Sequence, residues 1–240
     1  RYHWKHSTLE ELKITFPLRT YNSLMLRAQQ LNVKSSAQRN RKGNFLFLDK
    51  LTNNSVYWWG FIMADGHISK RGLHIGLSDL DKGHLSKLQH HLKIENMYIN
   101  SSKKQSFLAL EDKSWATKWR NLLEINLAKT YNPPNLNIFE SKEYFIYFLI
   151  GFIDGDGSIW LSRNHPNMRI ELHSSWLPVL EKWSKLILDY YGIQTRVRTT
   201  PRGYAQLIFN KKEHLKIMLP YLQDVDFLER KWNKLLNIFI

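Results

Sequence analysis

The chain has 240 residues, enough to bury one large core, and its 35 Lys and Arg against 21 Asp and Glu give a formal net charge of +14. Aromatic residues make up 13% of it, which excludes a disordered basic tail and indicates a folded protein with a large positive field. The absence of cysteine excludes disulfides and cysteine-based zinc sites, and the longest apolar run, Tyr144 to Ile153, is too short to span a membrane. We therefore expect a nucleic acid as the partner.

Residues 1–55 form a basic segment of their own, with ten Lys or Arg and three acidic residues. The pattern predicts a helix that has Ser7 as its N-cap and ends at Pro17, then a second helix from about Thr20 to Asn32. The stretch resembles helix-turn-helix segments, although no motif in it is specific. Two interpretations remain open: an arm that contacts DNA, which the charge favours, or a helical hairpin packed on the main domain.

The rest of the chain contains a repeat at a constant separation of 91 residues. It aligns residues 58–68 (WWGFIMADGHI) with residues 149–159 (LIGFIDGDGSI). The identical pairs are Gly60/Gly151, Phe61/Phe152, Ile62/Ile153, Asp65/Asp156, Gly66/Gly157 and Ile68/Ile159.

The segments after the two copies also match in kind. Alternating stretches at 73–77 and 168–172 predict strands, helical patterns come next at 80–92 and 177–191, then strand-like runs at 97–110 and 195–209, and helices at 114–127 and 212–222. Each half therefore predicts helix, two strands, helix, two strands, helix. We expect the first repeat at 56–130, a linker at 131–141 and the second repeat at 142–240, because the Asn132-Pro133-Pro134 sequence cannot be helical.

Small residues lie four apart within each copy, at Gly60 and Ala64 and again at Gly151 and Gly155. Residues four apart share a helix face, so two such helices can approach until their backbones nearly touch. Both stripes then end in Asp-Gly, which predicts Gly66 and Gly157 as left-handed residues that terminate the helices.

This arrangement places Asp65 and Asp156 together at helix C-termini, where the macrodipole and each other's charge disfavour them. A divalent cation resolves the conflict, because Mg²⁺ takes one or two carboxylates plus water and substrate phosphates. The unsatisfied backbone carbonyls of Ala64 and Gly155 are further candidate metal ligands. The chemistry indicated is metal-assisted displacement at a phosphate by an activated water.

Both segments resemble the LAGLIDADG motif of homing endonucleases, and two copies resemble the single-chain form of that family. The first copy departs from the pattern, with Trp58-Trp59 at its start and Met63 where an acid is usual. The resemblance covers roughly residues 56–240. It implies an α+β fold of two αββαββα repeats with pseudo-twofold symmetry, two sheets lying in the major groove, and Mg²⁺-dependent cleavage of both DNA strands at a long target. We expect Mn²⁺ to substitute, Ca²⁺ to allow binding with little or no cleavage, and a monomer without an obligate protein partner.

The resemblance also implies a lysine after the last strand of each half, near the site waters. By pattern these are Lys113 and Lys212, with Lys211 as an alternative one residue away; a solvated lysine at a helix start explains either equally well. A polar residue ending the second strand of each half borders the family's site, and here those positions are Ser78 and His173.

Strand alternation places one polar set of side chains opposite the apolar set that faces the helices. For DNA reading this set gives His74, Arg169, Arg196 and Arg198, together with Ser78 and His173. Basic residues at strand ends and turns are the natural phosphate contacts. These are Lys70, Arg71, Lys103, Lys104, Arg163 and Arg202.

The leading alternative is a relative of this fold that binds DNA or RNA without cutting, such as an intron maturase or a transcription regulator. Loss of either motif aspartate would favour it, and both are present. An intein with an embedded nuclease lacks support, since there is no cysteine and no flanking splicing sequence. No signal peptide is evident, and we expect an intracellular protein with access to DNA, in bacterial or phage-infected cytoplasm or an organelle, rather than a secreted one.

Overall fold

A computed structural model describes residue 12 and residues 14–31, 43–94, 97–100, 103–126, 128–163 and 165–239. Most of the first predicted helix lies outside these residues. The second is present as α3 (Tyr21–Gln30), and a short helix, α5 (Leu46–Asp49), precedes the repeated part of the chain. Whether residues 1–55 contact DNA stays a prediction.

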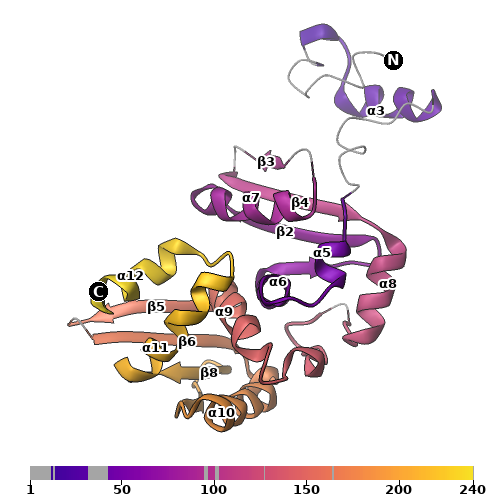
Figure 1. The fold of residues 1–240 in the computed structure, drawn as a ribbon. Helices are drawn as coiled ribbons and strands as arrows, with labels where there is room; N and C mark the ends of the chain where they lie inside the picture. The colour runs from indigo at the N-terminus through magenta and orange to yellow at the C-terminus, as the bar shows by residue number, and fades with distance from the viewer. Residues whose placement is uncertain are drawn as a thin grey trace.

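From residue 53 onward the described chain forms two halves with the same order of elements (Figure 1). The first half contains α6 (Asn53–Asp65), β1 (Gly66–Ile68), β2 (Gly72–Ser78), η1 (Asp79–Asp81), α7 (Lys82–His91), β3 (Tyr98–Asn100), β4 (Gln105–Glu111) and α8 (Lys113–Leu122), and η3 (Asn137–Phe139) follows in the connection. The second contains α9 (Phe145–Asp156), β5 (Gly157–Ser162), β6 (His165–His173), η4 (Ser174–Trp176), α10 (Leu177–Tyr191), β7 (Arg196–Thr199), β8 (Tyr204–Phe209), α11 (Lys212–Met218), η5 (Leu219–Asp224) and α12 (Glu229–Phe239). The predicted fold class is confirmed.

Each half carries one antiparallel sheet, in the order β1-β2-β4-β3 and β5-β6-β8-β7. The register is equivalent in the two, with Gly66 opposite Ile75 and Gly157 opposite Ile170. Alternate residues of a strand face opposite sides. Ile75 and Ile170 are therefore buried against the helices, while their neighbours on β2 and β6 face the other side of the sheet.

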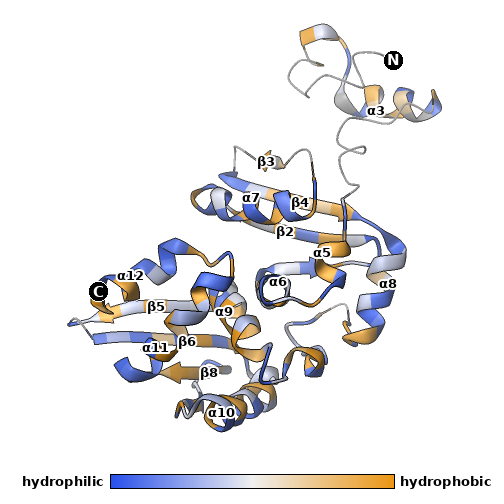
Figure 2. Cartoon of the chain, viewed as in Figure 1, coloured by the Kyte–Doolittle hydropathy of each residue, from blue (hydrophilic) through white to orange (hydrophobic). Residues whose placement is uncertain are grey.

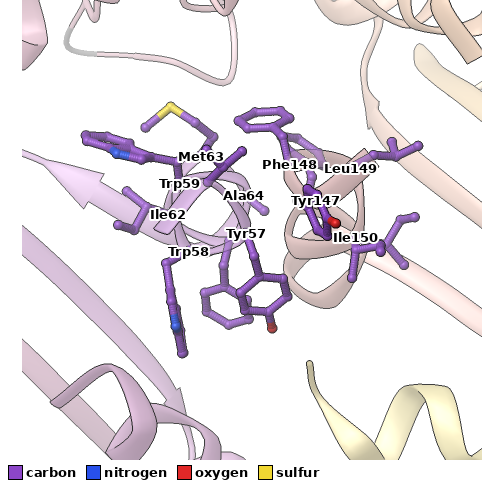
Figure 3. Packing of buried hydrophobic residues seen from close by; sticks show 14 of the residues in the cluster. Tyr57, Trp58, Trp59, Ile62, Met63, Ala64, Tyr147, Phe148, Leu149 and Ile150 are labelled. Carbon is purple, nitrogen blue, oxygen red and sulfur yellow. The ribbon is translucent and has the colours of Figure 1, made fainter. Parts of the chain in front are cut away.

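The helices α6 and α9 form the centre of the molecule and pack side by side (Figure 3). A Cβ added to Gly60 would collide with the Phe148 carbonyl, and one added to Gly151 would collide with the Tyr57 carbonyl. Both helices are therefore in backbone contact at these glycines, as the small-residue stripes predict. Figure 3 shows the side chains of Trp59 and Ile62 on α6, and of Leu149 and Ile150 on α9, pointing away from the contact into the core of each half.

The outer helices are amphipathic, as expected for helices that cover a sheet. Figure 2 shows α9 mostly in the hydrophobic colour, whereas α7 and α12 mix hydrophobic and hydrophilic residues. In α12, Trp232 and Leu235 are fully buried while Glu229 and Arg230 are exposed. None of the helices in the described part of the chain has the length and apolar character needed to cross a membrane.

Candidate functional site

Asp65 and Asp156 are the last residues of α6 and α9, and both side chains reach solvent. The close packing of the helices brings these two ends together. A Cβ added to Gly155 would collide with the side chain of Ala64 and would lie 3.3 Å from the backbone nitrogen of Asp65. The structure therefore brings the two predicted metal ligands to one place.

The glycines that follow the aspartates are not left-handed, and that prediction is wrong. Gly66 has φ −84° and Gly157 has φ −82°, both extended, because each helix continues directly into a strand. Space explains the glycines instead. A Cβ would lie 2.7 Å from the carbonyl oxygen of Ile62 at Gly66 and 2.6 Å from that of Ile153 at Gly157.

The ammonium of a lysine caps the C-terminus of α6, where a left-handed residue was expected. Lys129, in the connection after α8, directs its Nζ to the carbonyl oxygens of Met63 at 2.6 Å, Ala64 at 2.7 Å and Gly66 at 2.7 Å, with that of Ile62 at 3.3 Å. A helix C-terminus leaves its last carbonyls without intrahelical partners, and those of Met63 and Ala64 are among them. The ammonium also neutralises the negative end of the helix dipole.

A second lysine does the same at α9. Lys231, in the first turn of α12, donates from Nζ to the carbonyl oxygens of Ile153 at 2.9 Å, Asp154 at 2.6 Å, Gly155 at 2.9 Å and Gly157 at 2.7 Å. The two halves therefore present the same unit, an aspartate at a helix end beside a lysine ammonium.

The two aspartates and two lysines form one electrostatic cluster. The packed helix ends remove part of the water around Asp65, and this partial burial and then the charge of Asp156 raise its pKa to about 6, while Lys231 and Lys129 oppose that shift. Burial raises the pKa of Asp156 as well, against the same two lysines. Burial lowers the pKa of Lys129 to about 8 and also lowers that of Lys231, and the carboxylates oppose both shifts.

The backbone carbonyls of Ala64 and Gly155 have a different occupant from the predicted metal. Each accepts a hydrogen bond from a lysine ammonium, at 2.7 Å and 2.9 Å. An ammonium at that distance disfavours a second cation on the same oxygen by like-charge repulsion. The candidate ligand set is therefore narrowed to the carboxylates of Asp65 and Asp156.

These two carboxylates fit an open Mg²⁺ site. Across the described residues, no group of three or more His, Asp or Glu side chains could hold a metal. Asp65 and Asp156 offer one carboxylate each, from the ends of two different helices. That donor set suits a cation that completes its shell with water and substrate phosphates, as Mg²⁺ does.

The structure does not bring Lys113 or Lys212 to this site, which corrects the sequence-based choice. Gly66 is level with Leu108 across β2, and β4 then runs away from the site to Glu111, opposite Gly72. Lys113 therefore starts α8 roughly 17 Å further along the strand direction. The same geometry holds in the second half, where Lys212 is exposed with Nζ 5.2 Å from the ring centre of Phe239. Lys211, the alternative, is the exposed residue before α11.

A cavity of about 360 Å³ lies beside Asp156, and its walls include Lys129, Tyr131 and His173. His173 ends β6, and its ring stands edge-on to that of Tyr131 at 4.7 Å between centroids. Its Nδ1 accepts a hydrogen bond from the backbone N–H of Ser175, and His173 thereby caps the N-terminus of η4. Ser78 occupies the equivalent place in the first half, where its Oγ caps η1.

The open face of the second sheet carries a connected set of polar side chains. The guanidinium of Arg169 lies 5.4 Å from the ring centre of Trp160, and its NH1 lies 3.9 Å from a carboxylate oxygen of Glu171. The Gln206 amide donates to that same oxygen, and its own oxygen accepts from Arg198 Nε at 2.8 Å. Two of the predicted DNA-reading arginines are therefore held in place, and Arg196 is exposed beside them on β7.

The first sheet presents fewer charges on the equivalent face. His74 lies opposite His67 across β1 and β2, with 6.4 Å between ring centroids. The predicted phosphate contacts are all exposed and lie in the short connections between strands. They are Lys70, Arg71, Lys103, Lys104, Arg163 and Arg202.

The lysines of the site were not identified from the sequence. Lys129 and Lys231 are separated by 102 residues, whereas the motif repeats every 91, so the residue aligned with Lys129 is Pro220. The difference arises because α11 and η5 precede α12 in the second half, while Lys129 follows α8 directly. No spacing rule within the sequence links the two lysines.

Comparisons with known proteins link part of this chain to a family. Residues 143–222 match the model of the LAGLIDADG-like domain. No curated protein sequence matches the chain. Similar folds occur among solved structures at low identity, so the likeness to them concerns the fold.

Three of these structures illustrate the match. Full-length WhiA from Thermatoga maritima is 19% identical with a TM-score of 0.50, over 77% of this chain and 58% of its own, so this chain spans less than two thirds of that protein. The I-LtrWI LAGLIDADG homing endonuclease bound to its target DNA is 15% identical with a TM-score of 0.50, over 82% of this chain and 90% of its own. The meganuclease I-SmaMI bound to uncleavable DNA is 13% identical with a TM-score of 0.54, over 78% of this chain and 88% of its own.

Proposed function

We propose, given that this chain contains a LAGLIDADG-like domain and has the fold of LAGLIDADG homing endonucleases, that it is a site-specific endonuclease that cuts both strands of a DNA duplex. The observation that carries the proposal is the meeting of Asp65 and Asp156 at two adjoining helix ends, each beside a lysine ammonium. Two half-sites, each with an aspartate and a lysine, suit two scissile phosphates on opposite strands.

Asp65 and Asp156 would hold Mg²⁺, which would supply charge neutralisation at the phosphate and a water activated for attack. The protein's own contribution is positioning and charge. Lys129 and Lys231 hold the ends of α6 and α9, and they place positive charge beside the carboxylates where a phosphate would lie. Fixed charge of this kind stabilises the additional negative charge that develops as the phosphate is attacked.

The open faces of the two sheets would bind the duplex on either side of the site. The second sheet holds Arg169 and Arg198 through Glu171 and Gln206, and arginines held in this way suit guanine O6 and N7 in the major groove. The exposed lysines and arginines of the turns would contact phosphates. A monomer with internal pseudo-symmetry, intron homing and an intracellular location with access to DNA belong to this proposal.

One observation favours a second function, DNA binding without cleavage. Lys129 and Lys231 balance the charge of the two helix ends by themselves, so the aspartates do not require a metal to be tolerated in the fold. A regulator or an intron maturase with this fold could retain such a cluster as part of a DNA-binding surface.

Cleavage and binding selections separate the two functions. The full chain is incubated with a randomised duplex library and Mg²⁺, and cut ends are sequenced; a parallel selection with Ca²⁺ recovers bound duplexes. An endonuclease gives one family of cut ends that lies within the sequences bound in Ca²⁺. A specific bound sequence that is never cut with Mg²⁺ or Mn²⁺ supports the second function instead.

A further inference from the structure

Asp154 is a fully buried carboxylate two residues before Asp156. Its side chain is 2% exposed and accepts three hydrogen bonds of 2.7 Å, from the Tyr57 hydroxyl, the Leu228 backbone N–H and the Trp232 indole N–H. A charge without water is costly to bury, and these three donors are what offset that cost. The Asp154 carboxylate is therefore tolerated in the core because all three donors lie within hydrogen-bond distance of it.

Two of the three donors belong to the start of α12. Leu228 is the residue before α12, and its carbonyl accepts the first backbone hydrogen bonds of that helix. Trp232 lies one turn further on and is fully buried. Lys231 is the residue next to Trp232, and its ammonium donates to the Asp154 carbonyl at 2.6 Å. Asp154 thus contacts the start of α12 through three residues, Leu228, Trp232 and Lys231.

The third donor extends this network into the first half of the molecule. The Tyr57 hydroxyl lies 2.9 Å from Nε2 of His84 on α7, and the other ring nitrogen of His84 is buried without a partner. His84 is therefore neutral and donates to Tyr57, which in turn donates to Asp154. Arg230 and Glu229 of α12 also pair with Asp81 and Lys87 of the first half.

Among the residues that the structure describes, the first half has no equivalent of this network. The residue aligned with Asp154 is Met63, buried and unable to accept hydrogen bonds of this kind. The backbone around Lys129 is held by η4 of the second half. The Trp176 indole donates to the Lys129 carbonyl at 3.2 Å, and Ser175 donates to the Thr130 carbonyl. Lys129 and Lys231 therefore occupy matching positions, but different hydrogen bonds hold the backbone around each of them.

We infer that Asp154 is the positioning residue of Lys231: it fixes the first turn of α12 against α9 and so sets where the Lys231 ammonium stands, while Lys129 is independent of it. The position of Lys231 follows from the structure alone, and its consequence for DNA cleavage rests on the proposed function. The substitution of Met for the acid in the first copy of the motif then makes the two half-sites unequal.

Site-resolved acylation of lysines tests the position of Lys231. The full-length protein is treated with acetic anhydride at neutral pH, and peptides containing Lys129 and Lys231 are quantified by mass spectrometry. In the wild type both lysines should react slowly compared with exposed Lys113. In Asp154→Met, Lys231 should react at least about tenfold faster, because the hydrogen bonds that hold α12 are lost, and Lys129 should not change.

Milder variants keep the test decisive if Asp154→Met loosens the fold. Asp154→Asn retains one side-chain acceptor and should give an intermediate rate at Lys231, and Tyr57→Phe should give a smaller rise. Met63→Leu, at the aligned position, should leave both lysines protected. Unchanged protection of Lys231 in all of the Asp154 variants, or a parallel rise at Lys129, would overturn the assignment.

Strand-resolved cleavage tests the functional consequence. With a duplex labelled on each strand, Asp154→Asn should slow the cutting of one strand at least about tenfold more than the other and accumulate a nicked product, with Kd for the duplex within about twofold of the wild type. Equal slowing of both strands contradicts separate positioning of the two lysines. A wild type that cuts neither strand refutes the proposed function, while the acylation result still decides the role of Asp154.

Discussion

Lys129 and Lys231 occupy matching places in the two halves, each with its ammonium on the carbonyls at the end of a central helix. They are 102 residues apart, whereas the aspartates beside them are 91 residues apart. The negative ends of α6 and α9 are therefore neutralised by the protein's own cations. From the sequence, a metal ion was the positive charge expected to offset the two aspartates and the negative helix ends. The two lysines supply such a charge without a metal.

Replacing either lysine should impair cleavage far more than binding. Lys129→Met or Lys231→Met removes the ammonium that the proposed function places beside the scissile phosphate and leaves helix-end carbonyls without a partner, so we expect the cutting rate to fall about 10²-fold or more. Lys113→Met and Lys212→Met are matched controls, since both residues are exposed at helix starts away from the site. Single-turnover cleavage on a duplex measures the effect. Loss of activity in the controls with retention in the site variants would reverse the assignment.

Gly151→Leu should destabilise the protein by about 3 kcal/mol or more, since a side chain there meets the backbone of Tyr57, which cannot move aside as a side chain could. Gly83→Ala is the control. It lies in α7 with open space around it, and we expect a gain of about 0.5–1 kcal/mol from helix propensity. Urea unfolding of both variants gives the comparison. A Gly151→Leu protein as stable as the wild type would place the contact between halves elsewhere.

The buried histidine of the network predicts a dependence of stability on pH. Burial lowers the pKa of His84 to about 3, so the unfolded chain binds this proton below pH 6.5 and the folded protein does not. Its contribution to stability is thus fully present above pH 6.5 and is lost as the pH falls towards 3. Burial raises the pKa of Asp154 to about 6, which acts in the opposite direction.

The contribution of His84 is therefore measured as the difference in unfolding free energy between the wild type and His84→Gln at each pH. Between pH 6.5 and 3, the stability of the wild type should fall relative to that of His84→Gln by about 1.4 kcal/mol per pH unit. Above pH 7 the difference between the two proteins should be constant. A difference that stays constant down to pH 4 would mean that His84 is protonated in the folded protein.

Binding should weaken steeply with salt, because a surface with this charge releases many counterions from the phosphates. Deleting residues 1–42 should lower the affinity and flatten the dependence of log K on log salt if the basic segment contacts DNA. The deletion ends before Leu48, which is buried against the main domain. An identical slope would identify the segment as a structural addition.

Local patterns predicted much of the fold. The helix predicted at 177–191 is α10, and the period-two stretches at 73–77 and 168–172 lie within β2 and β6. The repeat located the contact between halves, because a backbone contact permits only glycine at Gly60 and Gly151 and both copies carry it. These features depend on neighbours in the sequence or on an exact repeat.

Features that depend on distant parts of the chain were missed. The sequence-based prediction did not name β1 and β5, which begin directly at the motif glycines, nor α12, which carries Lys231. The lysines reach the helix ends from elements placed differently in the two halves, so no periodicity connects them to the motif. Asp154 was assigned no role, because its partners lie 97, 74 and 78 residues away.

The cutting of a duplex by Asp65→Asn and Asp156→Asn, compared with the wild type in Mg²⁺, tests the central claim most directly. Each substitution keeps the size of the side chain, so fold and duplex Kd should change little, while double-strand cleavage should be abolished. Mn²⁺ should support cutting by the wild type, and Ca²⁺ should allow binding with little or no cutting, because its coordination is larger and less strict. Wild-type rates of double-strand cleavage in both variants would contradict the assignment of the two aspartates.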